Sequence, residues 1–353
     1  MGVLVAIEAR GHAFVDGLRR AWDRGDAVLP LDPRLPAAAA DALTDRLGVG
    51  DRIDDGAALV VATSGTTGAP RGVVHTHASV AASAAATSSF LRIDPDRHRW
   101  LACLPLAHVG GLSVVTRAIH VGAGLTVHDG FDAAAVDAAA DAGCTHVSLV
   151  ATALRRIDPT RWERIVLGGS APPPDRPANS IATYGLTETG SGVVYDGVPL
   201  PGVEVDVVDQ ELRLRGPMIA PHYRDGTPVV DDEGWLATGD LGAFEDGIVR
   251  VHGRRGDMII TGGENVFPDP VERRLRAHPD IADVAVVGRT DPEWGQRVVA
   301  VLELVDPAAE PTLDELRDWV KAELPAWCAP REAEVRPLPR TSLGKVRRSA
   351  LRH

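Results

Sequence analysis

The first half of the chain alternates short runs of aliphatic and β-branched residues with longer alanine-rich stretches, and this alternation limits the fold more than any other feature. Apolar runs of about four to eight residues between turn residues are typical of buried strands, whereas longer alanine-rich stretches favour helices. Strands that alternate with helices predict an α/β fold. We expect strands over residues 57–62, 100–104, 124–127, 146–150 and 164–167, and helices over 78–90 and 132–142.

The pattern changes in the second half of the chain. Residues 203–215 and 247–252 have the alternation and tight turns of strands, which predicts a β-rich portion. Beyond Arg254 we expect strands over 284–287 and 298–304 and helices over 270–278 and 313–324. We therefore predict a large N-terminal domain of mixed sheets, helices and the β-rich portion, followed from near Arg254 by a small α+β domain over residues 257–353.

Composition and charge exclude several classes of protein. The 353 residues include 37 Lys and Arg against 49 Asp and Glu, so the formal net charge is −12, which opposes binding to nucleic acid or to an anionic membrane. The stretch 78–90 holds too many Ser and Thr residues for a membrane span, and the apolar start reaches Glu8 too soon for a secretory signal. Three widely spaced cysteines, Cys103, Cys144 and Cys328, make no disulfide framework and favour a reducing cytoplasm.

The segment with the strongest chemical character is 63–73, which reads Thr-Ser-Gly-Thr-Thr-Gly-Ala-Pro-Arg-Gly-Val. Its glycines permit close approach of a ligand to the backbone, and its N–H and hydroxyl groups suit a polyphosphate. We expect it to follow a strand and to precede a helix, where anions bind well. The spacing is not that of a Walker A loop. The alternative is a glycine- and threonine-rich surface turn.

Five further segments follow in a fixed order, and together with 63–73 they resemble the adenylate-forming superfamily of acyl-CoA synthetases, luciferases and peptide-synthetase adenylation domains. They read Tyr-Gly-Leu-Thr-Glu-Thr, Trp-Leu-Ala-Thr-Gly-Asp, Gly-Arg-Arg-Gly-Asp, Gly-Gly-Glu-Asn and Pro-Arg-Thr-Ser-Leu-Gly-Lys, over residues 184–189, 235–240, 253–257, 262–265 and 339–345. The resemblance covers residues 57–349. It implies a large adenylate-forming domain over residues 1–253, a hinge over 254–256 and a mobile C-terminal lid over 257–353. It also implies a reaction in which a carboxylic acid and ATP form an acyl-adenylate.

The resemblance assigns a role to each motif residue. Tyr184 would offer its ring face to adenine, Asp240 would accept hydrogen bonds from the ribose hydroxyls, and Arg254 would support the ribose. Taken alone, Tyr184 could instead be a core aromatic residue and Asp240 a turn residue. The residues expected to bind ATP or AMP are Thr63, Ser64, Gly65, Thr66, Thr67, Gly68, Gly169, Ser170, Tyr184, Gly185, Asp240 and Arg254.

The expected catalytic residues are Lys345, Thr187 and Glu188. Joining a carboxylate to the α-phosphate brings two anions together, so the site needs positive charge. Lys345 is one of two lysines in the chain, and an ammonium is a compact donor that can bridge two oxygens. By resemblance it contacts the carboxylate and the phosphate, although a solvated tail charge is the alternative. Thr187 would hydrogen-bond the α-phosphate, and Glu188 would hold Mg²⁺.

The later motifs concern the hinge and the acyl acceptor. Gly256 occupies the hinge position where many members of the superfamily have Asp or Lys, and Arg71 stands where many have Lys. Gly262, Gly263 and Glu264 resemble the acyl-CoA ligase form of their motif, in which two glycines let a pantetheine arm pass along the backbone. CoA is therefore the expected acceptor, and a free-standing carrier protein is the alternative.

The acid is indicated by the segment 105–117, Pro-Leu-Ala-His-Val-Gly-Gly-Leu-Ser-Val-Val-Thr-Arg, and by Ser148, Thr152 and Leu154. Both resemble the o-succinylbenzoate–CoA ligases of menaquinone biosynthesis. Such a keto diacid needs hydrogen-bond donors beyond those at the reacting carboxylate, and His108, Ser113 and Arg117 are the candidates. His108 could instead be a core histidine, and Arg117 could pair with an acidic residue or a helix end.

The expected reaction converts 2-succinylbenzoate, ATP and CoA into 2-succinylbenzoyl-CoA, AMP and diphosphate, with ATP, Mg²⁺ and CoA as cofactors or co-substrates. Another aryl- or acyl-CoA ligase, or a catalytically silent nucleotide-binding or carrier-interaction module, is the alternative. We expect small-molecule partners and no nucleic acid or membrane insertion, and a homo-oligomer stays open. His75 and His77 lack the partners of a zinc site, so zinc is not expected.

Overall fold

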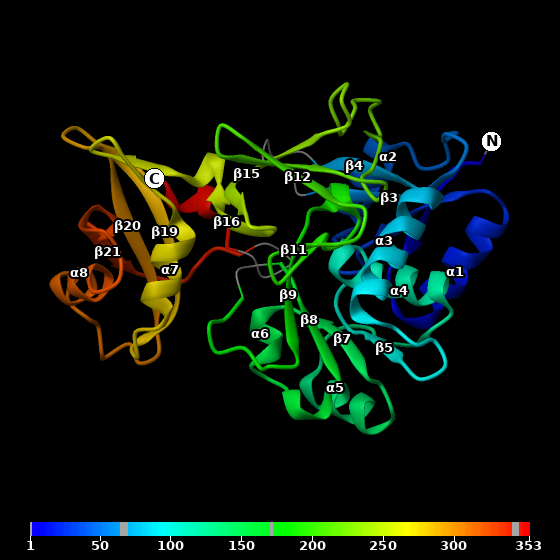
Figure 1. The fold of residues 1–353 in the computed structure, drawn as a ribbon, viewed down its shortest axis with the longest axis horizontal. Helices are drawn as coiled ribbons and strands as arrows, with labels where there is room; N and C mark the ends of the chain where they lie inside the picture. The colour runs from blue at the N-terminus through cyan, green and yellow to red at the C-terminus, as the bar shows by residue number, and fades with distance from the viewer. Residues whose placement is uncertain (1, 64–69, 170–171, 341–345) are drawn as a thin grey trace. The chain divides into compact units, whose positions relative to one another are not determined.

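The computed structural model describes residues 2–63, 70–169, 172–340 and 346–353 (Figure 1). Contacts divide the chain into two units. The first comprises Met1–Asp206, Arg213–Thr238 and Phe244–Val249, and the second comprises Val207–Leu212, Gly239–Ala243 and Arg250–His353. Within the described ranges, no helix is long and apolar enough to cross a membrane.

The first sheet has the strand order β1-β2-β3-β4-β14, and its first three strands are parallel. Its elements in chain order are β1 (Leu4–Glu8), α1 (Gly11–Asp23), β2 (Ala27–Leu31), α2 (Ala37–Leu47), β3 (Ala57–Thr63), β4 (Arg71–Thr76) and β14 (His222–Tyr223). The sequence analysis assigned no element before residue 57. These elements were missed because the apolar runs of β1 and β2 are short and β2 contains a proline.

One expectation about the glycine- and threonine-rich segment is wrong. The residues after it form β4, which pairs antiparallel with β3, so the segment joins two strands and does not lead into a helix. The helix α3 (His77–Leu91) begins one strand later, capped by the Thr76 hydroxyl, which accepts a hydrogen bond from the Ser79 N–H. The physical reason is that Val73 and Val74 are buried and β-branched, which favours a strand over a helix.

The second sheet has the order β11-β10-β9-β8-β7-β5-β6, and the strands from β9 to β6 are parallel. The predicted strands are confirmed, with bounds shifted by up to two residues. The elements are β5 (Arg99–Ala102), α4 (Val109–Val121), β6 (Gly124–Val127), α5 (Ala133–Asp141), β7 (His146–Leu149), α6 (Ala151–Leu154), β8 (Arg164–Leu167), β9 (Ser180–Tyr184), β10 (Val194–Tyr195) and β11 (Val198–Pro199).

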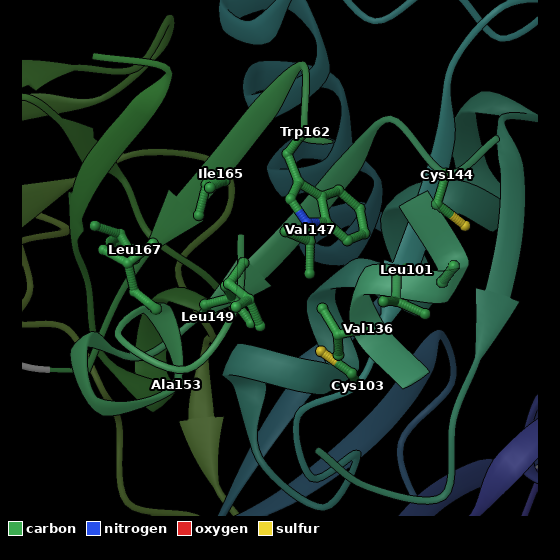
Figure 2. Close-up of a cluster of buried hydrophobic side chains, with 13 residues drawn as sticks. Leu101, Cys103, Val136, Cys144, Val147, Leu149, Ala153, Trp162, Ile165 and Leu167 are labelled. Carbon is green, nitrogen blue, oxygen red and sulfur yellow. The ribbon is translucent and has the colours of Figure 1, made fainter. Parts of the chain in front are cut away.

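Helices cover both faces of this sheet. On one face, alternate residues such as Val147, Leu149 and Ile165 pack with residues of α5 and α6 in the core drawn in Figure 2. On the other face, α4 packs against β5 and β7 and lies beside α3 (Figure 1). Cys103 and Cys144 are buried free thiols, and Cys328 is also free, as the sequence predicts. The position of α4 between a sheet and a neighbouring helix explains why so many of its residues are buried.

The β-rich portion is also confirmed. It is a sheet of order β12-β13-β15-β16, and the residue ranges of both units include parts of its strands. The strands are β12 (Glu204–Val208), β13 (Glu211–Arg215), β15 (Leu236–Glu245) and β16 (Ile248–Arg254).

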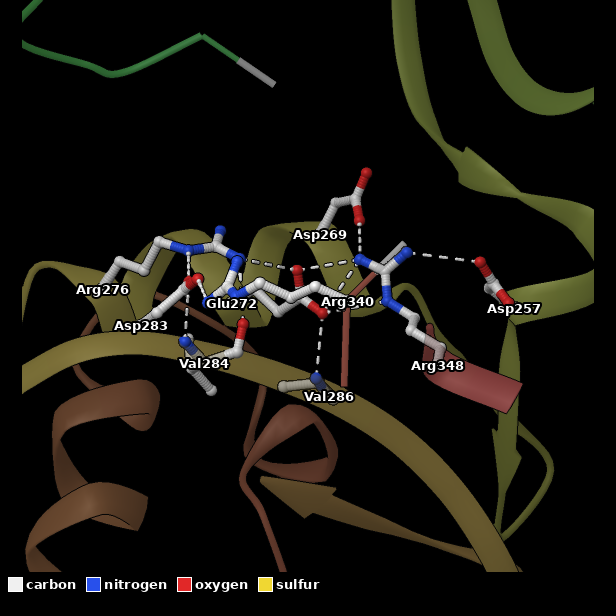
Figure 3. Close-up of polar contacts among 9 residues, drawn as sticks. All are labelled: Asp257, Asp269, Glu272, Arg276, Asp283, Val284, Val286, Arg340 and Arg348. Carbon is white, nitrogen blue, oxygen red and sulfur yellow. Dashed lines mark hydrogen bonds and ion pairs between the residues drawn. The ribbon is translucent and has the colours of Figure 1, made fainter. Parts of the chain in front are cut away.

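The second unit carries an antiparallel sheet with helices, as the α+β prediction requires. Its strand order is β18-β17-β20-β19, with β21 parallel to β20. The elements are β17 (Ile259–Thr261), β18 (Glu264–Val266), α7 (Pro268–Arg276), β19 (Ile281–Asp291), β20 (Gly295–Leu304), α8 (Leu313–Lys321) and β21 (Glu332–Val335). Ion pairs join the C-terminal residues to α7 and β19 (Figure 3).

Candidate active site

The turn that carries Thr187 and Glu188 follows β9 directly. Gly185 is required there by space, because a Cβ at this position would lie 2.2 Å from the carbonyl oxygen of Ser191. The hydroxyl of Thr189 accepts a hydrogen bond from the Leu186 N–H at 2.9 Å and donates one to the Ser191 carbonyl at 2.7 Å. These contacts close the turn on itself.

Glu188 is held by a residue that the sequence analysis missed. The Tyr223 hydroxyl donates a hydrogen bond to Glu188 Oε1 at 3.0 Å. Burial, with the nearby Glu188 carboxylate, raises the pKa of Tyr223 to about 12, so the phenol stays a donor. Tyr223 lies 35 positions away in sequence, and the pairing of β14 with β4 brings it close. No local pattern around residue 223 indicates this contact.

Arg71, which stands where many members of the superfamily have Lys, lies over the ring of Tyr223. Its guanidinium carbon is 3.6 Å from the centroid of the Tyr223 ring, and Nη2 is 3.1 Å from Asp225 Oδ2. The arginine therefore covers the ring whose hydroxyl orients Glu188.

The turn offers a divalent cation one oriented carboxylate, that of Glu188. Mg²⁺ takes oxygen ligands and keeps several waters, so a single oriented carboxylate such as Glu188 suffices on the protein side when phosphates supply further oxygens. In the part of the chain that the structure describes, no cluster of three or more His, Cys, Asp or Glu residues could hold a metal by itself.

The candidate acid-binding residues lie on or beside α4. His108 precedes the helix, and its Nε2 is 3.7 Å from Asp32 Oδ2. Ser113 is buried and lines a cavity of about 10 Å³, shared with His75, Ser83, Thr116 and Gly190 among others. No helix was predicted over this segment; the structure places Ser113 and Arg117 on α4 and His108 at its N-cap.

Arg117 has an unusual environment. Its side chain is 2% exposed, and its guanidinium carbon lies 4.6 Å from the centroid of the Trp100 indole. Nη2 donates a hydrogen bond to the Ser191 hydroxyl at 3.2 Å, but Nε and Nη1 have no hydrogen-bond partner among the described residues. Burial lowers the pKa of Arg117, and no described acidic residue pairs with it. The alternative that an acidic residue neutralises Arg117 therefore finds no support in the described chain.

The nucleotide motifs are divided between the two units. Tyr184 ends β9 in the first unit, where Gly169 also lies with a φ of 86°. In the second unit, Arg254 Nε lies 2.9 Å from Asp240 Oδ1, and Asp240 is buried. The sequence analysis expected Asp240 and Arg254 to act on the same ribose, and the structure brings them together.

The glycine positions of the second unit differ in whether the backbone conformation requires glycine. Gly262 and Gly263 form the turn between β17 and β18 with φ of 58° and 86°, and a Cβ on Gly262 would lie 2.7 Å from the Trp294 ring. Glu264 begins β18. Gly256 has an ordinary φ and open space around its Cβ position, so this conformation does not require glycine there.

Several predicted residues lie outside the described residues. They are Ser64, Gly65, Thr66, Thr67, Gly68, Ser170 and Lys345. Thr63, which begins the glycine- and threonine-rich segment, is the last residue of β3 and pairs with Arg71.

Comparison with protein families gives two matches. The AMP-binding enzyme family matches residues 45–223, and the AMP-binding enzyme C-terminal domain matches residues 270–345. The chain belongs to the AMP-binding enzyme family, and the predicted adenylate-forming superfamily is confirmed. It is an AMP-forming acid–CoA ligase.

Individual relatives agree with this class. The probable 2-succinylbenzoate–CoA ligase of Mycobacterium tuberculosis is 40% identical over 352 residues, which cover 91% of this chain and 91% of the relative. The 2-succinylbenzoate–CoA ligase of Salmonella typhimurium is 35% identical and covers 85% of this chain and 75% of its own length.

A solved structure has the same fold. The o-succinylbenzoate CoA synthetase of Bacillus subtilis, in complex with the acyl-adenylate intermediate OSB-AMP, has a TM-score of 0.84 and 26% identity, over 100% of this chain and 88% of that chain.

Proposed function

We propose that the chain is a 2-succinylbenzoate–CoA ligase. It joins the acid to ATP with release of diphosphate and then transfers the acyl group from AMP to CoA. The similarity to named ligases supports both the assignment to this class of enzyme and the proposed reaction. The buried guanidinium of Arg117 is the observation in this chain that most favours a diacid.

Electrostatics favours an acid that brings a second carboxylate to Arg117. A buried cation with two unused donors is costly, and a carboxylate that enters beside it supplies both charge and acceptors. A monoacid places its one carboxylate at the α-phosphate and leaves Arg117 uncompensated. A diacid provides a second carboxylate. We propose that Arg117 binds this second carboxylate, and that Ser113 and His108 bind other polar groups of the acid.

For the adenylation step we propose that a carboxylate oxygen attacks the α-phosphorus and diphosphate leaves. Mg²⁺ bound at Glu188 would neutralise phosphate charge, and Tyr223 orients that carboxylate. Thr187 is proposed to donate to the α-phosphate and Lys345 to bridge the two reacting anions. The nucleotide would be held by Thr63, Ser64, Gly65, Thr66, Thr67, Gly68, Gly169, Ser170, Tyr184, Gly185, Asp240 and Arg254.

For the thioester step we propose that the CoA sulfur attacks the acyl carbon and AMP leaves. The turn of Gly262 and Gly263 has no side chain to obstruct a pantetheine arm, and Glu264 follows it. We propose Gly256 as the hinge between domains 1–253 and 257–353, because glycine has the widest range of backbone angles. A cytoplasmic location and a possible homo-oligomer remain predictions.

Acid-dependent exchange of labelled pyrophosphate into ATP tests the proposed substrate. A panel should contain 2-succinylbenzoate, benzoate, a fatty acid and a malonate-type diacid. We expect 2-succinylbenzoate to support the fastest exchange. Faster exchange with benzoate or a fatty acid would favour another aryl- or acyl-CoA ligase, and no exchange with any acid would favour a catalytically silent module.

The role of Lys345 has its own test. Lys345→Ala should lower the rate of adenylation by about a thousandfold, because the two reacting anions lose their bridging cation. Thioester formation from supplied 2-succinylbenzoyl-AMP should fall much less. The other lysine gives the matched control Lys321→Ala, whose partner is the exposed Asp318. Equal loss in both half-reactions would contradict the assignment.

A further inference from the structure

A buried histidine that has no role in the proposed mechanism contacts the turn of Thr187 and Glu188. His75 lies on β4 and is 1% exposed, and its Nε2 is 2.8 Å from the carbonyl oxygen of Thr187. A carbonyl oxygen can only accept a hydrogen bond, so Nε2 carries the proton. The contact therefore fixes the tautomer of the ring.

The other ring nitrogen is free to accept. Nδ1 of His75 has no hydrogen-bond partner among the residues that the structure describes. His75 lines the small cavity together with Ser83, Ser113 and Gly190. A Cβ on Gly190 would lie 3.4 Å from Nδ1, so the glycine leaves this edge of the ring uncovered.

The ring is neutral near neutral pH. Burial lowers the pKa of His75 to about 4, although the bond to Thr187 opposes the change. A half-turn of the ring about the Cβ–Cγ bond would put Cε1 in the place of Nε2 and lose the hydrogen bond to Thr187, so this contact fixes the orientation of the ring.

Two neighbouring strands thus hold the same turn. β4 supplies the bond from His75 to the main chain of Thr187, and β14 supplies the bond from Tyr223 to the side chain of Glu188. The two strands pair through Val73 and Val74. Because the Thr187 carbonyl belongs to the peptide that links Thr187 to Glu188, fixing it fixes the orientation of the Glu188 N–H.

We propose that His75 is a positioning residue that orients the Thr187–Glu188 peptide for phosphate and Mg²⁺ binding. The inference rests on the proposed function of these two residues. His75 also borders the cavity of Ser113, so it joins the acid-binding helix to the turn that acts on phosphate.

Two amide substitutions separate this role from simple packing. The side-chain amide of Gln reaches the position of the histidine Nε2, whereas that of Asn reaches only the position of Nδ1. We expect His75→Asn to lower kcat of pyrophosphate exchange by about tenfold to a hundredfold. The substitution should also raise KM for Mg²⁺–ATP. KM for 2-succinylbenzoate should stay within about twofold, and His75→Gln should retain kcat within about threefold of wild type.

The matched control is His278, whose ring packs edge-on against Trp319 in the second unit. His278→Asn should leave exchange at the wild-type rate. The proposal is overturned if His75→Asn is as active as wild type, if His75→Gln is as impaired as His75→Asn, or if the control loses as much activity. Absence of exchange in the wild-type enzyme would instead contradict the proposed function.

A measurement on the unmutated enzyme covers the case in which His75→Asn does not fold. Nitrogen-15 NMR of the imidazole near neutral pH should show a proton on Nε2 and a bare Nδ1. A doubly protonated ring, or a proton on Nδ1, would overturn the proposal.

Discussion

Arg117 of the first unit is buried and Arg348 of the second is half-buried, and their charges are compensated in opposite ways. Arg348 pairs with Asp257, Asp269 and Glu272, at 3.3, 2.7 and 2.8 Å. Burial by itself would lower the pKa of Arg348, but these carboxylates raise it (Figure 3). Arg117 has one hydrogen-bond partner among the described residues, the Ser191 hydroxyl, and its pKa is lowered by burial.

The difference distinguishes a structural cation from a binding cation. The carboxylate of Glu272 is itself buried and accepts a further hydrogen bond from the Val286 N–H, so the Arg348 cluster is internally complete. Such a cluster fixes the end of the chain to α7 and needs nothing from outside. Arg117, by contrast, is buried with two donors that no described residue engages, which is the state expected of a site that receives an anion.

The largest expected effect is the loss of activity in Arg117→Leu. Its kcat/KM for 2-succinylbenzoate should fall about a thousandfold, because the second carboxylate then enters an apolar site without a partner. The free energy of unfolding should change by less than about 1 kcal/mol or should rise, since no ion pair is broken. Steady-state kinetics and urea unfolding measure the two quantities. A stability loss as large as that of Arg348→Met would remove the distinction.

The second-largest expected effect is a loss of stability in Arg348→Met. Removal of the guanidinium leaves Asp269 and Glu272 close together without their shared partner, and the free energy of unfolding of the second unit should fall by about 3 kcal/mol. Urea unfolding followed by the fluorescence of Trp294 and Trp319 measures it. Arg352→Met is the matched control, because its exposed pair with Asp257 should contribute less than about 1 kcal/mol. Equal effects of the two substitutions would contradict the prediction.

The smallest effect is a difference in acid sensitivity between the units. In the first unit, burial lowers the pKa of His75 to about 4, so the unfolded chain takes up protons first and stability declines as pH falls below the ordinary value of 6.5. In the second unit, Arg289 lowers the pKa of Glu334 to about 2, so its stabilisation is present above the ordinary carboxylate pKa of 4.5 and declines as pH falls toward 2.

Hydrogen exchange of the two units as a function of pH measures this difference. We expect protection in the first unit to weaken at higher pH than in the second, and His75→Gln to reduce the pH dependence of the first unit. The same acid midpoint in both units would show that these groups do not dominate acid unfolding.

Ordered motifs and apolar runs were enough to predict the family, the α/β class and several of the strands. The bounds 124–127 and 164–167 agree with β6 and β8, because a short buried strand is encoded by its own residues. The structure of residues 71–76 was predicted wrongly: a helix was expected directly after the glycine- and threonine-rich segment, although the β-branched Val73 and Val74 favour a strand. The antiparallel partner β3 decided in favour of the strand.

The sequence by itself determined which chemistry the chain can perform, since residue types such as Glu188 and Arg117 stand within recognisable motifs. Only the tertiary structure decided which partners these side chains have. The bonds from Tyr223 to Glu188 and from His75 to Thr187 depend on strand pairing and helix packing, as does the lack of an acidic partner for Arg117 among the described residues. The physical reason is that local propensity acts over a few residues, whereas desolvation and hydrogen bonding depend on every element that packs around a group.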